Sequence, residues 1–331
     1  MTRYARQMIL PEVGAAGQAA ITEAHVLVVG AGGLGAPVLS YLVGAGVGRI
    51  TLVDGDVVSL SNLHRQTLFD EEDVGQPKAS AAAAHLRRLN SQCRINTLAQ
   101  PLTPANAAAL VAASTVVLDC ADSFAASYIL SDHCRAAGVP LISASALGFA
   151  GYVGGFCGTA PSLRAVFPDL PERAATCATA GVMGPVVGMV GAAQAQMTLN
   201  HLIGQTPSPL GQLISFDVQN YCTGGFRFDG AAEPDDALGF ITPTDILASD
   251  FVVELRDVVE APIPVHAVAR RIPVAAFKAS QYQPGPGQRA VFACRSGLRA
   301  WQAATHLRSY WAGDISLIAL GDTSSTERPD T

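Results

Sequence analysis

The stretch His25-Val-Leu-Val-Val-Gly-Ala-Gly-Gly-Leu-Gly35 decides the fold. Its first half is a short, continuous apolar run, which is typical of a fully buried parallel strand. The glycines that follow, Gly30, Gly32 and Gly35, have the spacing that allows a tight turn and a close approach of backbone to phosphate. The helix expected after them presents unpaired N–H groups and the positive end of its dipole. The stretch therefore predicts a Rossmann-like nucleotide-binding unit, and it leaves the kind of nucleotide open.

Strands and helices alternate on either side of this stretch. The sequence predicts strands over 25–30, 49–54, 115–120 and 139–145, and helices over 36–45, 79–89 and 126–137. Alternation of this kind predicts an α/β fold, a Rossmann-like and mostly parallel sheet with helices on both faces.

The composition changes after about residue 222. The segment 223–245 mixes Gly, Asp, Pro and Ala with little periodicity, which is typical of a linker. Beyond it, strands over 251–257, 290–297 and 315–320 and a helix over 298–311 predict a smaller α/β unit. We therefore predict a nucleotide-binding domain at 1–222, a linker at 223–245, a second domain at 246–322 and a disordered tail at 323–331.

Composition and charge exclude several classes of protein. Hydrophobic residues make up 49% and charged residues 15%, as in a core-rich globular chain. The formal charge of -6, with no block of basic residues, gives no reason to expect a nucleic-acid or membrane partner. The weakly polar run 180–197 contains two Gln, four Gly and a Pro, so we expect a buried helix and not a membrane span. Seven irregularly spaced cysteines and a start without a signal-peptide pattern predict a cytoplasmic protein.

Polar and basic residues follow the second predicted strand. Asp54 ends that strand, where an acidic residue usually binds ribose hydroxyls. Asn62, Arg65 and Lys78 come soon after, and a triphosphate site needs such groups to offset charge before a nucleophile approaches. Asp122 follows the third predicted strand at its carboxyl end, where ligands bind in such sheets, and it could hold a magnesium ion. An NAD-dependent dehydrogenase explains the glycines and Asp54 but has no need of the other residues.

Six motifs in this order resemble the MoeB/ThiF family, the ubiquitin-activating-enzyme-like adenylyltransferases of sulfur-carrier proteins. They are Arg3-Tyr-Ala-Arg-Gln7, Gly30-Ala-Gly-Gly-Leu-Gly35, Val53-Asp-Gly-Asp56, Ser61-Asn-Leu-His-Arg-Gln66, Gly75-Gln-Pro-Lys78 and Asp119-Cys-Ala-Asp122. The resemblance covers about residues 3–222. It implies ATP-dependent adenylation of the C-terminal Gly-Gly carboxylate of a ubiquitin-like sulfur-carrier protein, with ATP and Mg²⁺ as cofactors.

The resemblance also implies roles for particular residues. The residues that bind ATP would be Gly32, Gly33, Gly35, Asp54, Asp56, Ser61, Asn62, Arg65, Gln66, Lys78, Asp122 and Ser123. The catalytic residues would be Arg6, Arg65, Lys78 and Asp122. Among them Asp122 would position magnesium, and Arg6 would reach the nucleotide of the other subunit in a homodimer.

Two cysteines are candidates for thiol chemistry. Cys177 matches the position of a crossover-loop cysteine that links covalently to the carrier in some family members, and a filler role is equally open. Cys294 begins a motif that resembles the active-site loop of a rhodanese domain, over about residues 245–322. Backbone N–H groups at a helix N-terminus, with Arg295 and Arg299, predict a stabilised persulfide and a lowered pKa of the Cys294 thiol. The persulfide loop comprises Cys294, Arg295, Ser296, Gly297, Leu298 and Arg299.

The chain departs from the family pattern at the structural zinc. Members usually carry two Cys-x-x-Cys pairs, but this sequence has none, and Ser162 and Ala165 stand where the first thiols would be. Zinc is therefore not expected, and the sequence does not show what holds that segment instead. Ser123, Ser127 and Tyr128 stand where the family more often has Asn, Arg and Asn.

Other interpretations stay open at this point. The chain could be a catalytically degenerate carrier-binding protein, an NAD-dependent oxidoreductase, or an enzyme that adenylates a peptide or a modified tRNA base. The sequence also leaves open which pathway is served, molybdopterin, thiamin or a related sulfur pathway. A sulfur donor such as a cysteine desulfurase is a further expected partner. Finally, the glycines over 181–191 recur along one helix face and suit either a dimer interface or a tightly packed core helix.

Overall fold

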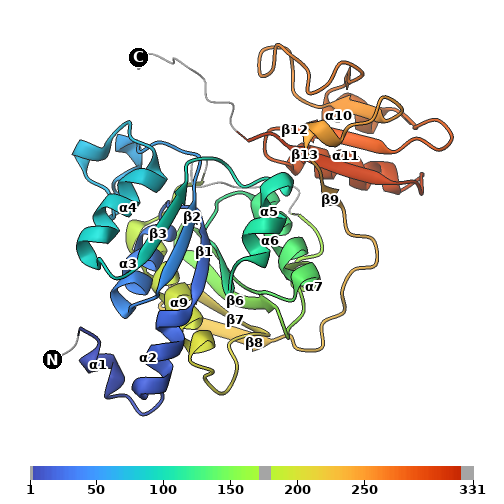
Figure 1. Cartoon of the computed structure of the whole chain (residues 1–331). Helices are drawn as coiled ribbons and strands as arrows, with labels where there is room; N and C mark the ends of the chain where they lie inside the picture. Colours follow the sequence, from blue (N-terminus) through green and yellow to red (C-terminus); the bar gives the residue numbers. More distant parts are fainter. Residues whose placement is uncertain (1–2, 171–179, 322–331) are drawn as a thin grey trace.

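The computed structural model describes residues 3–170 and 180–321 and contains two α/β units, each built on its own sheet (Figure 1). The strands of the larger sheet are β1 (His25–Val29), β2 (Arg49–Val53), β3 (Arg94–Leu98), β4 (Val116–Asp119), β5 (Pro140–Leu147), β6 (Ala150–Cys157), β7 (Gln212–Asp217) and β8 (Cys222–Arg227). Those of the smaller sheet are β9 (Gly239–Phe240), β10 (Phe251–Glu254), β11 (Arg270–Arg271), β12 (Ala290–Cys294) and β13 (Ile315–Ala319). The α-helices are α1 (Ala5–Met8), α2 (Gly14–Glu23), α3 (Gly35–Ala45), α4 (Lys78–Leu89), α5 (Pro104–Ala112), α6 (Phe124–Ala137), α7 (Leu163–Val166), α9 (Gly184–Leu202), α10 (Val274–Ala279) and α11 (Leu298–Arg308).

Helices cover both faces of the larger sheet, as the sequence predicts. Helices α3, α4 and α9 lie over one face, and α5, α6 and α7 over the other (Figure 1). Strand β1 lies between the two layers, with Val26 and Val28 in one apolar core and Leu27 and Val29 in the other. A strand covered on both sides needs apolar residues at successive positions, which explains its continuous apolar run.

The larger sheet is parallel in one half and antiparallel in the other. Strands β3-β2-β1-β4-β5 run parallel in that order, and β6, β7 and β8 continue the sheet antiparallel. The sequence predicts β2, β1, β4 and β5 of the parallel half but misses the edge strand β3 and the whole extension, whose strands contain glycines that strands usually avoid. At Gly155 in β6, an added Cβ would lie 2.5 Å from the carbonyl oxygen of Pro209. A glycine there lets two backbone segments approach closely.

The smaller sheet is parallel throughout, in the order β11-β10-β12-β13-β9. Helix α11 packs on β12 and β13, and α10 packs on α11. The predicted linker at 223–245 is shorter in the structure, because residues at its start belong to the larger sheet and residues near its end to the smaller sheet. Strand β8 extends the larger sheet to Arg227, and β9 at 239–240 is already part of the smaller sheet. The predicted tail at 323–331 lies outside the described residues.

Helix α9 contains most of the predicted glycine face. An added Cβ at Gly184 would lie 2.5 Å from the carbonyl oxygen of His64, and one at Gly191 would lie 2.7 Å from that of Leu34. Those two glycines therefore serve close packing within the chain, whereas an added Cβ at Gly188 meets no atom within 4 Å. Among the helices at 3–170 and 180–321, none is both long and apolar enough to cross a membrane.

Candidate nucleotide site and cysteine loop

The glycine loop connects β1 to α3 at the point where the strand order reverses, since β1 pairs with β2 on one side and β4 on the other. Ligands of open α/β sheets bind at such a point, beyond the carboxyl ends of the strands. Gly30 has a φ of 98°, which favours glycine, and an added Cβ there would lie 2.6 Å from the carbonyl oxygen of Cys120. At Gly35 an added Cβ would lie 2.1 Å from the carbonyl oxygen of Gly30. Only glycines fit this turn.

Asp54 holds the glycine loop from the end of β2. One carboxylate oxygen accepts the Ala31 N–H at 2.7 Å, and the other accepts the Asp56 N–H at 2.8 Å. Burial raises the pKa of Asp54, and these two N–H donors oppose that rise. Asp54, the residue predicted to bind ribose, therefore also stabilises the glycine loop through the N–H of Ala31.

The segment Ser61–Gln66 folds over the glycine loop. An added Cβ at Gly32 would lie 3.6 Å from Nε2 of Gln66, and one at Gly33 would lie 3.6 Å from Cγ of Arg65. Gln66 is 4% exposed, and its Nε2 donates to Oδ1 of Asn62 at 3.3 Å. Its Oε1 has no partner, and among the described residues it is the one side-chain polar atom reported as buried and unpaired. Such a buried acceptor is completed by a donor from water or from a ligand.

Lys78 reaches the site from the start of α4. Its Nζ donates to Oδ2 of Asp56 at 2.9 Å, with the lysine side chain 6% exposed and the aspartate 74% exposed. The backbone N–H of Lys78 also donates to the carbonyl of Asp56 at 2.9 Å. Through Asp56 and Asp54, the ammonium group is tied to the glycine loop. The structure thus brings together Asp54, Asp56 and Lys78, which the sequence predicted as ATP-binding residues.

Two aspartates at the end of β4 differ sharply. Asp119 is fully buried and accepts hydrogen bonds from the Ser143 hydroxyl at 2.8 Å and the Ala121 N–H at 3.2 Å. Burial raises the pKa of Asp119, and the nearby charge of Asp122 adds to that rise. Asp122 itself is exposed, and Ser123 after it is the N-cap of α6. Asp119 is therefore structural, while the carboxylate of Asp122 is accessible to a ligand.

Gln194 of α9 is a residue that the sequence analysis missed. Its Nε2 donates to the carbonyls of Asp119 at 2.8 Å and Ile142 at 2.9 Å, and its Oε1 accepts from Sγ of Cys120. The amide thus ties the end of β4 to the first half of β5. A glutamine within the mostly apolar stretch 186–197 was the available signal.

Arg6 and Cys177 stand apart from this cluster. Helix α1, which contains Arg6, is anchored by Gln7, whose Nε2 donates to the carbonyl of Ala45 at 2.8 Å. Ala45 ends α3, whereas the glycine loop precedes its first residue, about 16 Å away along an 11-residue helix. Arg6 therefore lies at the far end of α3 from the glycine loop of its own chain. Cys177 lies outside the described residues.

Hydrogen bonds hold the segment where the family pattern would place zinc. Ser162 is 2% exposed, and its N–H donates to Glu233 at 2.7 Å while its hydroxyl donates to the other oxygen of that carboxylate. Arg135 of α6 completes the cluster with an ion pair to Glu233 at 2.9 Å. The next N–H, of Leu163, donates to the hydroxyl of Ser131 at 3.1 Å. The cluster supplies the anchor that the sequence does not reveal.

Cys294 ends β12 and is fully buried. Its Sγ accepts the N–H groups of Gly297 at 3.1 Å and Ala300 at 3.4 Å, so the predicted loop does close around the sulfur. The net pKa effect is opposite to the prediction, because burial raises the pKa of the Cys294 thiol more than these donors and Arg299 lower it. Arg299 is itself held by a two-point ion pair with Glu260. Cys120, Cys134 and Cys157 are buried in the core of the larger unit.

A buried ion pair supports the Cys294 loop from β10. Glu254 is 0% exposed and receives two hydrogen bonds from the guanidinium of Arg256, at 2.9 and 2.7 Å, and one from the Val265 N–H at 2.9 Å. Burial acts to raise the pKa of Glu254, but the bonds from Arg256 and Val265 hold it below its ordinary value. The glutamate is therefore a charged, fully bonded anchor.

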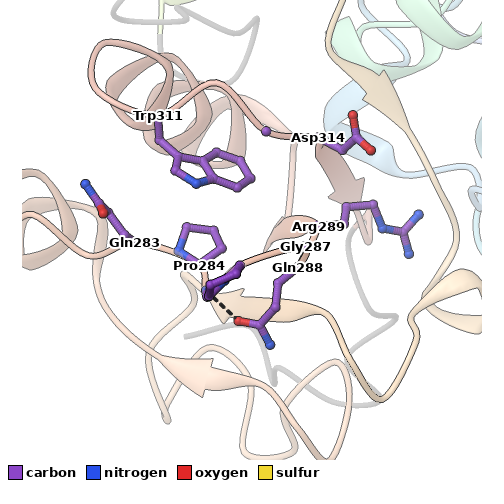
Figure 2. A pocket seen from close by; sticks show the side chains of 10 residues that line it. Gln283, Pro284, Gly287, Gln288, Arg289, Trp311 and Asp314 are labelled. Carbon is purple, nitrogen blue, oxygen red and sulfur yellow. Dashed lines mark hydrogen bonds between the residues drawn. The ribbon is translucent and has the colours of Figure 1, made fainter.

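A hollow of about 580 Å³ lies at the other end of the smaller sheet (Figure 2). Trp311, Pro284 and Arg289 line it, and β12 begins directly after Arg289. Because β12 runs for five residues from there to Cys294, about 16 Å separates the hollow from the cysteine loop. The hollow is thus separate from both candidate sites.

The fold and the glycine-loop site define a Rossmann-type nucleotide-binding protein. Residues 4–235 match the sequence model of the ThiF family. The chain belongs to the ThiF family, which confirms the resemblance seen in its motifs.

Named relatives and solved structures agree with this assignment. Adenylyltransferase and sulfurtransferase MOCS3 of Sus scrofa is 49% identical over 219 residues, which are 65% of this chain and 48% of that protein. SAMP-activating enzyme E1 of Haloferax volcanii is 39% identical over 222 residues, 66% of this chain and 82% of that protein. The chain thus spans about half the length of the MOCS3 relatives it matches. E. coli MccB has the same fold, with a TM-score of 0.62 at 20% identity over 72% of this chain and 74% of that chain.

Proposed function

We propose that the protein uses ATP to adenylate the C-terminal Gly-Gly carboxylate of a ubiquitin-like sulfur-carrier protein. The observation that carries this proposal is the segment Ser61–Gln66 folded over the glycine loop, with Oε1 of Gln66 buried and unpaired. Two relatives named for adenylation or activation, MOCS3 and SAMP-activating enzyme E1, support it. Membership of the ThiF family favours this function over an NAD-dependent oxidoreductase.

The site has the features that a bound ATP requires. Glycines at 32 and 33 leave backbone accessible beneath Arg65 and Gln66. The glycine loop just before α3 offers the N–H groups of Gly32 and Gly33 to phosphate oxygens, since Ala36 and Val38 at the start of the helix donate to carbonyls of the chain and Pro37 has no N–H. We assign the Gln66 Oε1 to a hydroxyl or amino group of the nucleotide, since an acceptor needs a donor. The E. coli MccB neighbour has been solved with ATP, which agrees with nucleotide binding by this fold.

The exposed carboxylate of Asp122 suits Mg²⁺. This cation prefers oxygen ligands and is usually held by one or two carboxylates together with phosphates and water. Asp119 is unsuited, because its oxygens are already engaged by Ser143 and Ala121. When bound, the ion would neutralise negative charge on the phosphates.

The residues of the chain address the repulsion between a carboxylate and a polyphosphate. In the reaction, an oxygen of the carrier's carboxylate forms a bond to the α-phosphorus, the bond from that phosphorus to the β-bridging oxygen breaks, and pyrophosphate leaves. Lys78, presented by Asp56, and Arg65, over the glycine loop, bring positive charge to this place. Holding both reactants in line reduces the barrier further.

We propose that the second unit carries sulfur on Cys294. The two N–H groups that point at Sγ would stabilise the anionic terminal sulfur of a persulfide. The name of the MOCS3 relatives includes sulfurtransferase, and the match to the Sus scrofa protein covers 65% of this chain. The raised pKa of the Cys294 thiol means that the resting loop stores a protonated thiol.

Further partners complete the proposal. The position of Arg6 at the far end of α3 suits a homodimer in which it serves the nucleotide of the other subunit. A cysteine desulfurase is the proposed class of sulfur donor, and the cytoplasm is the proposed location.

The test measures each half-reaction separately. Carrier-dependent ATP–pyrophosphate exchange reports adenylation, and release of thiocyanate from thiosulfate and cyanide reports sulfur transfer. We expect Asp122→Asn to lower exchange at least 100-fold, because one oxygen ligand and its charge are lost, and to leave thiocyanate release unchanged. Cys294→Ser should do the reverse.

Asp235→Asn is the matched control, since Asp235 is an exposed aspartate between the two sheets and should affect neither activity. Normal exchange in Asp122→Asn would remove the assigned role of that carboxylate. Exchange absent from the unaltered protein with every Gly-Gly carrier would favour a degenerate carrier-binding protein.

A further inference from the structure

The second unit docks on helix α6 of the nucleotide-binding unit. Ala125, Tyr128 and Asp132 are three and four residues apart along α6, a spacing that places them on one face. Gly297 and Trp301 are four residues apart at the start of α11 and also share a face. Tyr128 and Trp301 lie with ring centroids 5.6 Å apart and belong to one apolar core that combines residues of both units.

Arg164 sits at the centre of this contact. Its guanidinium carbon lies 4.5 Å from the Tyr128 ring centroid and 5.9 Å from that of Trp301. Its Nε and one Nη donate to the two oxygens of Asp132 at 2.6 and 2.8 Å. The same Nη donates to the carbonyl of Leu238 at 2.9 Å, just before β9. Arg164 therefore binds α6 and the entry to the second unit at once, and it is 3% exposed.

The docking sets the cysteine loop beside the nucleotide site. Gly297 has a φ of 86°, and an added Cβ there would lie 2.9 Å from the Phe240 ring and 3.5 Å from Cβ of Ala125. Ala125 is three residues from Asp122, so at most about 11 Å separates their Cα atoms. Helix α6 begins two residues after the proposed magnesium carboxylate, and Ala125 in its first turn lies against Gly297 of the Cys294 loop.

We propose that Arg164, packed against the rings of both Tyr128 and Trp301, locks the second unit onto α6 and so presents the Cys294 loop to the nucleotide site of the same chain. The proposal deepens the proposed function and rests on it. Arg164 is a positioning residue, because it acts through the placement of the loop. A planar guanidinium suits this place, since it can stack on two rings while it forms a two-point ion pair.

The first readout is physical and needs no activity. The sequence has two tryptophans, so Trp311→Phe leaves Trp301 as the single tryptophan, which is excited at wavelengths where the seven tyrosines absorb little. In this background we expect Arg164→Ala to shift the Trp301 emission to longer wavelength and to raise acrylamide quenching at least threefold. Tyr128→Phe, which keeps the ring, should retain the emission of the background protein. Arg270→Ala is the matched control, because Arg270 lies over Phe251 at 5.4 Å within the second unit, away from α6.

The second readout separates positioning from folding. Arg164→Ala should keep carrier-dependent pyrophosphate exchange and thiocyanate release within twofold of the unaltered protein. In sulfur transfer to the carrier, the terminal sulfur of the Cys294 persulfide bonds to the acyl carbon of the carrier adenylate and AMP leaves, which gives an acyl disulfide; an added dithiol then reduces the S–S bond and releases the thiocarboxylate and the Cys294 thiol. Thiocarboxylate formation, followed by mass in single turnover with a persulfide-loaded chain and that dithiol, should fall at least tenfold. Should Arg164→Ala not fold, Asp132→Asn is the second variant, since it weakens the ion pair with Arg164 and the Asp132 side chain is 37% exposed. Trp301 fluorescence and thiocarboxylate formation are then measured on Asp132→Asn.

Each outcome decides the matter. Unchanged Trp301 fluorescence in Arg164→Ala and Asp132→Asn would overturn the lock. Changed fluorescence with undiminished thiocarboxylate formation would overturn its purpose. If the unaltered protein lacks pyrophosphate exchange, the proposed function fails, and the purpose of the lock fails with it, while the fluorescence still decides whether the lock exists.

Discussion

Replacing Glu233 by alanine tests whether hydrogen bonds do the structural work at Ser162. The carboxylate accepts the N–H and the hydroxyl of Ser162 and pairs with Arg135. Alanine removes all three interactions and leaves the two buried donors of Ser162, its N–H and its hydroxyl, without an acceptor. The chain before α7 should therefore open more readily.

The magnitude follows from the exposure of each group. Arg135 is 53% exposed, so its ion pair contributes no more than about 0.5 kcal/mol. Ser162 is 2% exposed, and each buried donor left without an acceptor costs about 1–3 kcal/mol. Glu233 is 24% exposed, which lets some water replace it and favours the lower end of that range. The expected loss is about 2–3 kcal/mol, measured as local stability.

Hydrogen exchange of the Leu163 amide is the suitable assay. That N–H keeps its own acceptor, the Ser131 hydroxyl, in the variant, so its exchange reports opening of the segment and not the lost bond. A loss of 2–3 kcal/mol corresponds to about 30- to 140-fold faster exchange, because 1.4 kcal/mol is a factor of ten. Glu233→Gln keeps one acceptor oxygen and should give an intermediate rate.

Two results would refute the reasoning. Exchange of Leu163 accelerated less than threefold in Glu233→Ala would mean that the carboxylate is not the anchor. Faster exchange of the unaltered protein after addition of a strong zinc chelator would mean that a metal holds the segment despite Ser162 and Ala165.

Two further predictions concern other parts of the chain. Gly35→Ala should reduce the free energy of unfolding by about 3 kcal/mol or more, since its Cβ would lie 2.1 Å from the Gly30 carbonyl oxygen. Gly44→Ala on the same helix is the control: its Cβ meets no atom within 4 Å, so the free energy of unfolding should rise by about 0.5–1 kcal/mol. Urea unfolding of both variants measures the difference. Because the pKa of Glu254 is lowered in the folded protein, its ion pair with Arg256 stabilises the second unit fully at pH values above the ordinary glutamate pKa of about 4.3. This stabilisation is lost as the pH falls through the lowered pKa of the folded protein. Glu254→Gln should therefore be less stable at pH 7 and show a shallower loss from pH 5 to 3, and equal pH slopes in urea unfolding would contradict this.

The nucleotide half could be predicted because its signals are local. The glycine loop, Asp54 and Asp122 follow β1, β2 and β4, whose apolar runs mark their carboxyl ends, and parallel strands bring those ends together. The antiparallel extension was hidden, because β6 and β8 contain glycines in place of the β-branched residues that usually mark strands. Those glycines are explained only by neighbouring backbone, which the sequence does not display.

The pKa of Cys294 could not be predicted for a different reason. The sequence identifies the N–H donors and Arg299, which lower it, but it does not report burial, which raises it. Two effects of opposite sign compete, and their balance depends on how completely Phe240 and the rest of the core close over the loop.

The departure from the family's zinc pattern and the docking of the second unit are linked through one short segment. Ser162 turns its donors to Glu233, and two residues later Arg164 extends to Asp132 and the Trp301 ring. Arg135, which pairs with Glu233, and Asp132, which pairs with Arg164, both lie in α6. Thus the residues that anchor the segment also fix the helix on which the cysteine loop rests. A change that opened the Ser162 anchor should therefore also loosen Arg164, and the two tests, exchange at Leu163 and emission from Trp301, should respond together.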